Sequence, residues 1–193
     1  MKSFILSTAA LGITAASAQA AVVYDEAVDG GLSNDPLAPT VIDFNVGDNT
    51  VIGNTGPGNF PPPINPGLDA FTFTIEPGEQ LTGIFLDGFT PDAPANTTGM
   101  VLFDGNQGSG STFSFIGGGG FGTGDIGSNI GQAIVTDPAG AGLSLPLGPG
   151  DYTFETREFG GQTDWEVRFT VVPAPGAAGL LGLAGLAAAR RRR

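Results

Sequence analysis

The sequence predicts an all-β protein, an antiparallel β-sandwich of jelly-roll-like type. The first observation is composition, because short β-prone runs across residues 21–172 are separated by Gly, Pro and Asn, as in sandwiches and barrels. The second is alternation, since "DAFTFTI" places Phe71, Phe73 and Ile75 on one face and two threonines on the other. The third is that no stretch of this region sustains a 3.6-residue period. Strands with one apolar face are expected to pack as two layers.

These patterns predict nine strands, which in chain order are Val22–Asp25, Thr40–Phe44, Thr50–Asn54, Asp69–Ile75, Gln80–Asp87, Gly99–Phe103, Thr112–Ile116, Asp151–Glu158 and Asp164–Val172. Alternation in the last two strands directs Tyr152 and Trp165 inward, so both are expected in the core. Residues 124–135 favour one or two helical turns, weakened by glycines. The proline-rich segment 54–67 and the glycine-rich segment 116–124 are expected to be loops.

The last two strands are expected to form a hairpin with a two-residue turn at Gly161-Gln162. In that register the opposed pairs are Arg157 with Glu166, Glu155 with Arg168, Phe154 with Phe169, and Tyr152 with Val171. A turn at Gly160-Gly161 is the alternative. It would oppose Glu155 and Glu166, a like-charge pair that is unfavourable.

The N-terminus has the three parts of a secretory signal. Lys2 gives a positive start, Phe4–Ala16 is a short apolar run, and Ala18-Gln19-Ala20 forms an A-x-A cleavage site. Residues 1–20 are therefore expected to be a helical signal peptide, with Ala21 as the mature N-terminus. The alternative is a short N-terminal membrane anchor, which the small residues at the end of the run disfavour.

Charge and composition exclude many functions. The chain contains no His and no Cys, and the region between its two ends holds Arg157 and Arg168 against 19 acids, a formal charge of −17. Triads that use His, thiol nucleophiles and His metal ligands are excluded, and nucleic acid and anionic lipid should be repelled. A hydrolase with paired carboxylates remains an alternative. The acids, however, are interpreted as solvated surface groups, so the protein is expected not to be an enzyme.

Calcium is the one cofactor that the sequence suggests, because loops rich in Asp and Asn supply the oxygen ligands that it prefers. The candidate ligands are Asp104, Asn106 and Ser109 in "FDGNQGSGS", Asp125 and Asn129 in "TGDIGSN", and Asn34 and Asp35 in "SNDP". Of these, Asp104, Asn106 and Asp125 are the predicted calcium ligands. None of these loops has the EF-hand spacing. The alternative is that the same side chains form Asx turns with nearby backbone.

The C-terminus reads "VPAPGAAGLLGLAGLAAARRRR". Fourteen uncharged residues, Gly176–Ala189, are short for a membrane span, and the arginines behind them should stay on the cytoplasmic side. This segment resembles the PEP-CTERM sorting tail of Gram-negative bacteria in its V-P-x-P variant. The motif is Val172-Pro173-Ala174-Pro175, with Ala174 where the family has Glu, and the basic cluster consists of Arg190, Arg191, Arg192 and Arg193.

The resemblance implies a sorting route. Signal peptidase would remove residues 1–20, and the tail 173–193 would insert transiently in the membrane as a short hydrophobic helix, where an exosortase processes it. Family members are exported and are often linked to extracellular polysaccharide or biofilm matrix. The segments "DAFTFTIEPGEQLTGIFLD" and "LPLGPGDYTFETREFGGQTDWEVRFTV" are similar to bacterial pre-peptidase C-terminal domains, which are non-catalytic β-sandwiches.

The expected function is therefore that of an exported, exosortase-sorted protein of the cell surface or extracellular matrix, with a structural or adhesive β-sandwich at 21–172. A calcium- or carbohydrate-binding module is the first alternative, and the hydrolase is the second. Glycan binding favours exposed aromatic rings on a concave face. The inward parity of Tyr152 and Trp165 argues against it.

Overall fold

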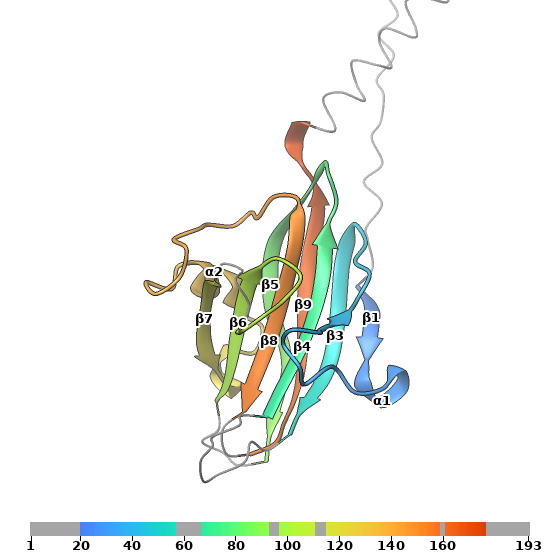
Figure 1. Ribbon diagram of the computed structural model, residues 1–193, viewed down its shortest axis with the longest axis vertical. Coiled ribbons are helices and arrows are strands. Elements are labelled where there is room, and N and C mark those ends of the chain that lie inside the picture. Colours follow the sequence, from blue (N-terminus) through green and yellow to red (C-terminus); the bar gives the residue numbers. More distant parts are fainter. Residues whose placement is uncertain (1–19, 57–66, 93–96, 111–114, 159–160, 177–193) are drawn as a thin grey trace, which may run out of the picture.

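The computed structural model describes residues 20–56, 67–92, 97–110, 115–158 and 161–176, and within them two β-sheets pack face to face (Figure 1). Sheet A contains, in spatial order, β1 (Ala21–Asp25), β3 (Gly47–Thr55), β9 (Thr163–Pro173) and β5 (Glu79–Pro91). Sheet B contains β2 (Thr40–Val41), β4 (Gly67–Ile75), β8 (Gly150–Glu158), β6 (Thr98–Asp104) and β7 (Phe115–Phe121). The expected signal helix and tail helix lie outside the described residues.

The two-layer prediction is confirmed, and each predicted strand overlaps an observed one. The sheets are mixed rather than purely antiparallel, because β1 pairs with β3, and β2 with β4, in parallel. The chain passes from β1 in sheet A through β2 in sheet B before it returns to β3. No tight turn joins either parallel pair, so nothing imposes antiparallel pairing at these edges.

The core lies between the sheets and is centred on Phe169 of β9. Its ring lies 5.1–5.7 Å, centroid to centroid, from the rings of Phe44, Phe71, Phe73 and Phe154. The prediction that Tyr152 and Trp165 point inward is confirmed, since both side chains are buried. Burial of one such aromatic side chain contributes about 1.5–3 kcal/mol to stability.

The predicted hairpin between the last two strands is wrong, because β8 and β9 belong to different sheets. Arg157 pairs with Glu155 of its own strand, and Arg168 pairs with Asp87 and Asp48 of sheet A. Phe154 and Phe169 still meet, but as an edge-to-face pair between the layers with centroids 5.3 Å apart. Alternation fixes which side chains face inward, and a connection that changes sheets satisfies that pattern as well as a hairpin does.

The prediction of a loop at 116–124 is also wrong, because most of it forms the edge strand β7. The expected helical turns are present as the 3₁₀ helix η1 (Thr123–Asp125) and α2 (Ile130–Val135). A Cβ at Gly117 would overlap the carbonyl oxygen of Ile134, and one at Gly140 would overlap that of Ile116. The glycines therefore permit α2 and the residues after it to pack directly on the strand backbone.

Candidate functional site

The predicted signal cleavage site lies at the boundary of the fold. Ala18 lies outside the described residues, Ala20 is exposed, and β1 begins at Ala21. Cleavage between Ala20 and Ala21 would thus remove no residue of a strand. A four-residue helix, α1 (Glu26–Asp29), follows directly, capped by the side chain of Asp25.

The predicted sorting motif, Val172-Pro173-Ala174-Pro175, straddles the end of β9. Val172 and Pro173 are the final residues of β9, and the backbone N–H of Ala174 donates to the carbonyl oxygen of Gly78 at 2.7 Å. Pro173 and Pro175 are exposed. The motif is therefore anchored to the sandwich at Ala174 and open to solvent at both prolines. Arg190–Arg193 lie outside the described residues.

The structure does not bring the predicted calcium ligands together. Asp104, Asn106 and Ser109 lie at and after the end of β6, whereas Asp125 lies in η1. Asp104 is the last residue of β6, whereas Asp125 follows the end of β7 that lies opposite the first residue of β6, so the two acids lie at opposite ends of β6. Within the described ranges, no three acidic side chains gather in a way that could hold a metal ion.

Three of these seven side chains make local turn and cap contacts. The Asp125 carboxylate accepts from the Gly122 N–H at 2.9 Å, and the Asp35 carboxylate accepts from the Leu37 N–H at 2.9 Å. Asn129 caps α2 by accepting from the Gly131 N–H at 3.1 Å. Asn34 is exposed in the turn beside Asp35. These contacts fit the Asx-turn alternative.

Three acids are buried, and for them the expectation of solvated surface groups is wrong. The first, Asp69 of β4, is 8% exposed. Its carboxylate accepts from the hydroxyl of Thr55 at 2.5 Å and from that of Thr156 at 3.4 Å, and Trp165 Nε1 donates to Thr55 Oγ1 at 2.8 Å. The pKa of Asp69 is raised to about 7, mainly by burial and to a smaller extent by the negative charge of Glu26, while the hydroxyl contacts of Thr55 and Thr156 oppose the shift. This network joins both sheets.

The second buried acid, Glu158 of β8, lies on the same face of that strand as Thr156. Its carboxylate accepts from the hydroxyls of Thr98 at 2.9 Å and Thr163 at 3.1 Å. Within the described residues, every buried side-chain nitrogen and oxygen has a hydrogen-bond partner. Together with the Asp69 network, these contacts make one end of the core polar but fully hydrogen-bonded, which fits a structural role.

The third buried acid, Glu155, lies on the outer face of sheet B and is fully buried. One carboxylate oxygen accepts from the backbone N–H of Ser109 at 2.5 Å, and the other pairs with Arg157 at 2.6 Å. The loop after β6 folds over this face (Figure 1), and a Cβ at Gly108 would overlap the Glu155 carboxylate. Local sequence patterns do not reveal this burial, since it depends on the covering loop.

Beside that loop lies a groove of ≈ 370 Å³, here called the Asp151 groove. Its floor is formed by Thr72 and Thr74 of β4, and Asp151 of β8 lies at its side. Its residues are Leu37, Ala38, Pro39, Val41, Thr72, Phe73, Thr74, Asn106, Gln107 and Asp151. The groove therefore combines an aliphatic wall with polar groups, and it includes the predicted ligand Asn106.

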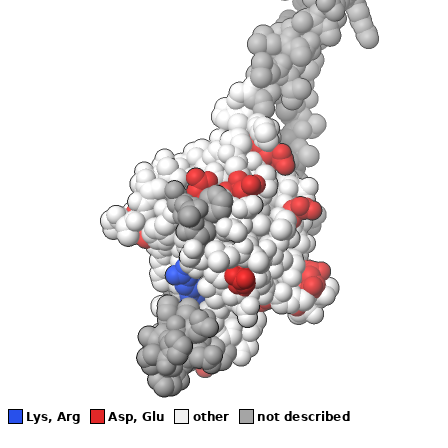
Figure 2. All heavy atoms as spheres, in the orientation of Figure 1, with Lys and Arg blue, Asp and Glu red and all other residues white. Residues whose placement is uncertain are grey.

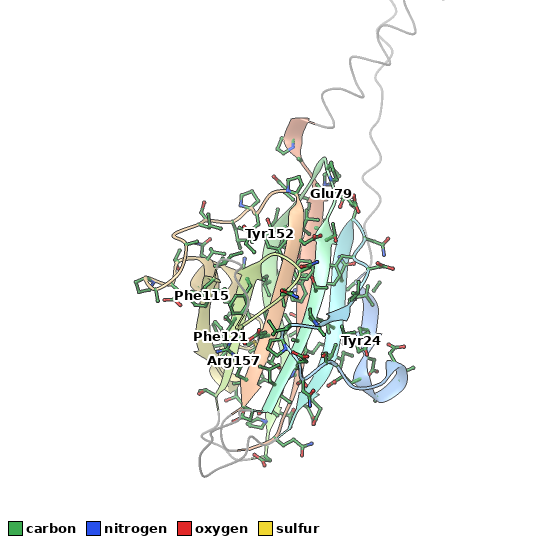
Figure 3. All side chains as sticks on the ribbon, in the orientation of Figure 1. Tyr24, Glu79, Phe115, Phe121, Tyr152 and Arg157 are labelled. Carbon is green, nitrogen blue, oxygen red and sulfur yellow. The ribbon has the colours of Figure 1, made fainter. Side chains whose placement is uncertain are left out.

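A second groove of ≈ 480 Å³, the Asp104 groove, lies at the end of the sandwich under residues 142–149. Asp104 and Tyr152 line it, and the Tyr152 hydroxyl donates to the Gly148 carbonyl oxygen at 2.8 Å. Burial, with a smaller effect from the charge of Asp104, raises the pKa of Tyr152. Tyr152 and Arg157 mark opposite ends of β8 (Figure 3).

Comparison with known proteins gives no relative: no protein family, curated protein or solved structure matches this chain. Among the described residues, none of the helices has the length and apolar character that a membrane crossing requires.

Proposed function

We propose that the chain is an exported, exosortase-sorted protein of the cell surface or extracellular matrix. Its jelly-roll-like sandwich would serve a structural or adhesive role without catalysis. Signal peptidase would remove residues 1–20, and an exosortase would process the tail 173–193 during its transient insertion in the membrane. The observation that carries this proposal is the sequence of the C-terminal tail, in which the V-P-x-P motif, the uncharged stretch and the four arginines follow one another in this order.

The boundaries of the fold support this scheme. The first strand begins at Ala21, and the backbone contact of Ala174 with Gly78 lies at the end of the sandwich. Almost all of the strand content therefore lies between the two predicted processing points. Every strand of the described residues lies between Ala21 and Pro173, so removal of residues 1–20 and of the tail after Pro175 should leave these strands intact.

Strand register also supports it. Ala21 lies opposite Asn49, and Asn49 lies opposite Phe169, four residues before Pro173. The start of β1 and the end of β9 thus point to the same end of sheet A. If both terminal segments entered the same membrane, the sandwich would be held at one end of sheet A, where β1 begins and β9 ends.

The absence of catalysis is supported by chemistry. The chain has no His and no Cys, and the buried carboxylates of Asp69 and Glu158 are held by threonine hydroxyls inside the core. Neither acid lines the Asp151 groove or the Asp104 groove. A general acid must reach its substrate within hydrogen-bond distance, which these enclosed positions do not offer.

Intact mass of the protein recovered from its native cell surface tests the proposal. The expected mass lacks residues 1–20 and the four arginines. Replacing Arg190–Arg193 with Ser should send unprocessed protein past the inner membrane, because arginines resist translocation. Pro173→Leu should leave the body membrane-bound and uncut, because it removes one of the two exposed prolines.

The two variants also control for folding. Both should unfold at the wild-type denaturant concentration, since Pro173 is exposed at the last position of β9. Wild-type surface protein that still carries its arginines would contradict sorting and favour a simple C-terminal anchor.

A further inference from the structure

We propose that the Asp151 groove binds an uncharged, hydroxyl-rich ligand, namely a neutral carbohydrate. The inference rests on the proposed adhesive function and gives it a ligand class and a location. Its volume of ≈ 370 Å³ falls within the range of about 300–1,000 Å³ that is usual for small-ligand sites. The contacts come from aliphatic and polar side chains rather than from a stacked aromatic ring, because the ring of Phe73 beneath the groove is buried.

The groove contains hydrogen-bonding groups that the fold leaves open. The exposed amide of Asn106 has no hydrogen-bond partner in the described part of the chain. Asp151 uses one carboxylate oxygen to accept from the Thr74 hydroxyl at 2.7 Å, and its other oxygen accepts no hydrogen bond from the described residues. An amide both donates and accepts, and a carboxylate accepts strongly. This pair suits neighbouring hydroxyl groups, each of which can donate and accept.

The opposite wall supplies the apolar contact. Leu37 is 47% exposed and Val41 is 74% exposed, and both line the groove. Exposed aliphatic side chains next to polar groups match a sugar ring, which has a C–H face and hydroxyl edges. Burial of these side chains against such a face would be favourable by about 25 cal/mol per Å² of apolar area.

The two walls are fixed before any ligand arrives. Gln107 Nε2 donates to the Leu37 carbonyl oxygen at 2.9 Å, and the Gly108 N–H donates to the Pro36 carbonyl oxygen at 2.7 Å. The Gly105 N–H donates to the Asp151 carbonyl oxygen at 2.8 Å. A preformed site spends little binding energy on ordering its own side chains and loops.

Charge selects against anions. Asp151 is the one ionisable residue that lines the groove. Arg157 is paired with Glu155, and Arg168 is paired with Asp87 in the other sheet. Figure 2 shows acidic side chains scattered over the face in view and one small basic patch on it. Uronates and sulfated sugars would therefore meet net repulsion, with no unpaired cation lining the groove.

Affinity electrophoresis of the purified full chain tests the site, in native gels that contain a neutral glucan, a neutral galactan or a polyuronate. At least one neutral polysaccharide should retard the protein, and the polyuronate should not. Asn106→Ala should weaken the apparent affinity about tenfold, the effect of one lost hydrogen bond. Asp151→Asn should weaken it by a similar factor, because a charge-assisted hydrogen bond to the ligand becomes a weaker neutral one. Asn can still accept from Thr74, so Asp151→Asn keeps the local contact.

The matched control is Asp104→Asn, which makes the same charge change in the neighbouring Asp104 groove and should bind as the wild type does. Retardation by the polyuronate alone, no retardation by either neutral polysaccharide, or equal losses from Asp104→Asn and Asp151→Asn would each overturn the proposal. The sorting test reads the mass of the C-terminus, so the two proposals fail separately. Retained arginines with intact glucan binding would contradict sorting alone, and correct processing without glycan binding would contradict the site alone.

Discussion

Asp69 is the residue whose chemistry the fold changes most. In water an aspartate is ionised at neutral pH, but burial between the sheets raises the pKa of this carboxyl from 3.8 to about 7. The hydroxyls of Thr55 and Thr156 lie against it, and the carboxylate of Glu26 disfavours a second negative charge nearby. The folded protein therefore prefers the protonated acid below pH 7.

This preference predicts a pH-dependent stability. Because the folded pKa is raised, the native state binds an extra proton between about pH 4 and pH 7, and stability falls as pH rises through that window. The shift from 3.8 to about 7 corresponds to at most about 4 kcal/mol. Asp69→Asn should flatten the dependence, as measured by denaturant unfolding at pH 5 and pH 8. A variant with the wild-type slope would show that other groups cause it.

The inward orientation of Asp69 could be predicted from the sequence, although its burial was not expected. The alternation that directs Phe71 and Phe73 inward also directs Asp69 inward, and the same rule on β8 directs Glu158 inward. Acidic side chains are usually solvated, but here the alternation along the strand gives the correct prediction, because Asp69 and Glu158 face inward and are buried. Glu155 is the opposite case. Its parity is outward, and a loop from elsewhere in the chain buries it.

At the scale of elements, Glu155 fastens the loop after β6 to the sheet. Glu155→Ala should leave the Ser109 N–H without its acceptor and should destabilise the fold by about 1–3 kcal/mol. Hydrogen exchange at Gly108 and Ser109 should accelerate more than exchange in β8. Glu166→Ala, on the outer face of sheet A, is the control and should cost less. Unchanged exchange in the loop would contradict a fastening role.

The glycine run of β7 predicts a pair of contrasting substitutions. Gly117→Ala should destabilise the protein by about 1–3 kcal/mol, because the new methyl group would overlap the Ile134 carbonyl oxygen of α2. Gly120→Ala should be close to neutral, since the nearest atom to its Cβ is Thr97 Oγ1 at 3.6 Å. Thermal unfolding of both variants provides the comparison. Equal losses would mean that strand propensity, not contact with α2, determines the requirement for glycine.

The conformation of β7 could not be predicted from local sequence. Four consecutive glycines have low β propensity, and on local grounds residues 116–124 are a loop. Their strand conformation comes from pairing with β6 and from the close approach of α2 and residues 137–141. Tertiary contact overrides local propensity here, and those contacts join residues that no local window contains.

At the scale of the whole molecule, inward-facing patterns predicted two layers but not the order of strands within them. The separation of β8 and β9 into different sheets depends on which neighbours each strand finds. β8 lies between β4 and β6, and β9 lies between β3 and β5. For the Asp151 groove, the sequence predicted Asn106 as a calcium ligand in a loop, but its place beside Asp151 and Val41 in one groove results from this strand order.

The order of the strands within the sheets also predicts how much of the chain is needed for folding. Among the described residues, β9 is the last strand along the chain, and it is an interior strand of sheet A. A chain that ends at residue 162 should lack cooperative unfolding, whereas one that ends at residue 176 should unfold at the wild-type denaturant midpoint. Circular dichroism during a urea titration distinguishes them. A sharp transition in the shorter chain would show that sheet B alone holds the fold.

Under the proposed sorting scheme, this placement of β9 also determines when an exported chain could fold. A chain that crosses the membrane from its N-terminus brings out β3 and β5 long before the strand that joins them, and closing such distant segments is slow. The body would remain open, and compatible with threading, until residues 163–173 emerge. Under the proposed sorting scheme, closure of the sandwich and arrival of the V-P-x-P motif outside the membrane would coincide, so a newly exported chain would reach the processing enzyme only when its body can fold.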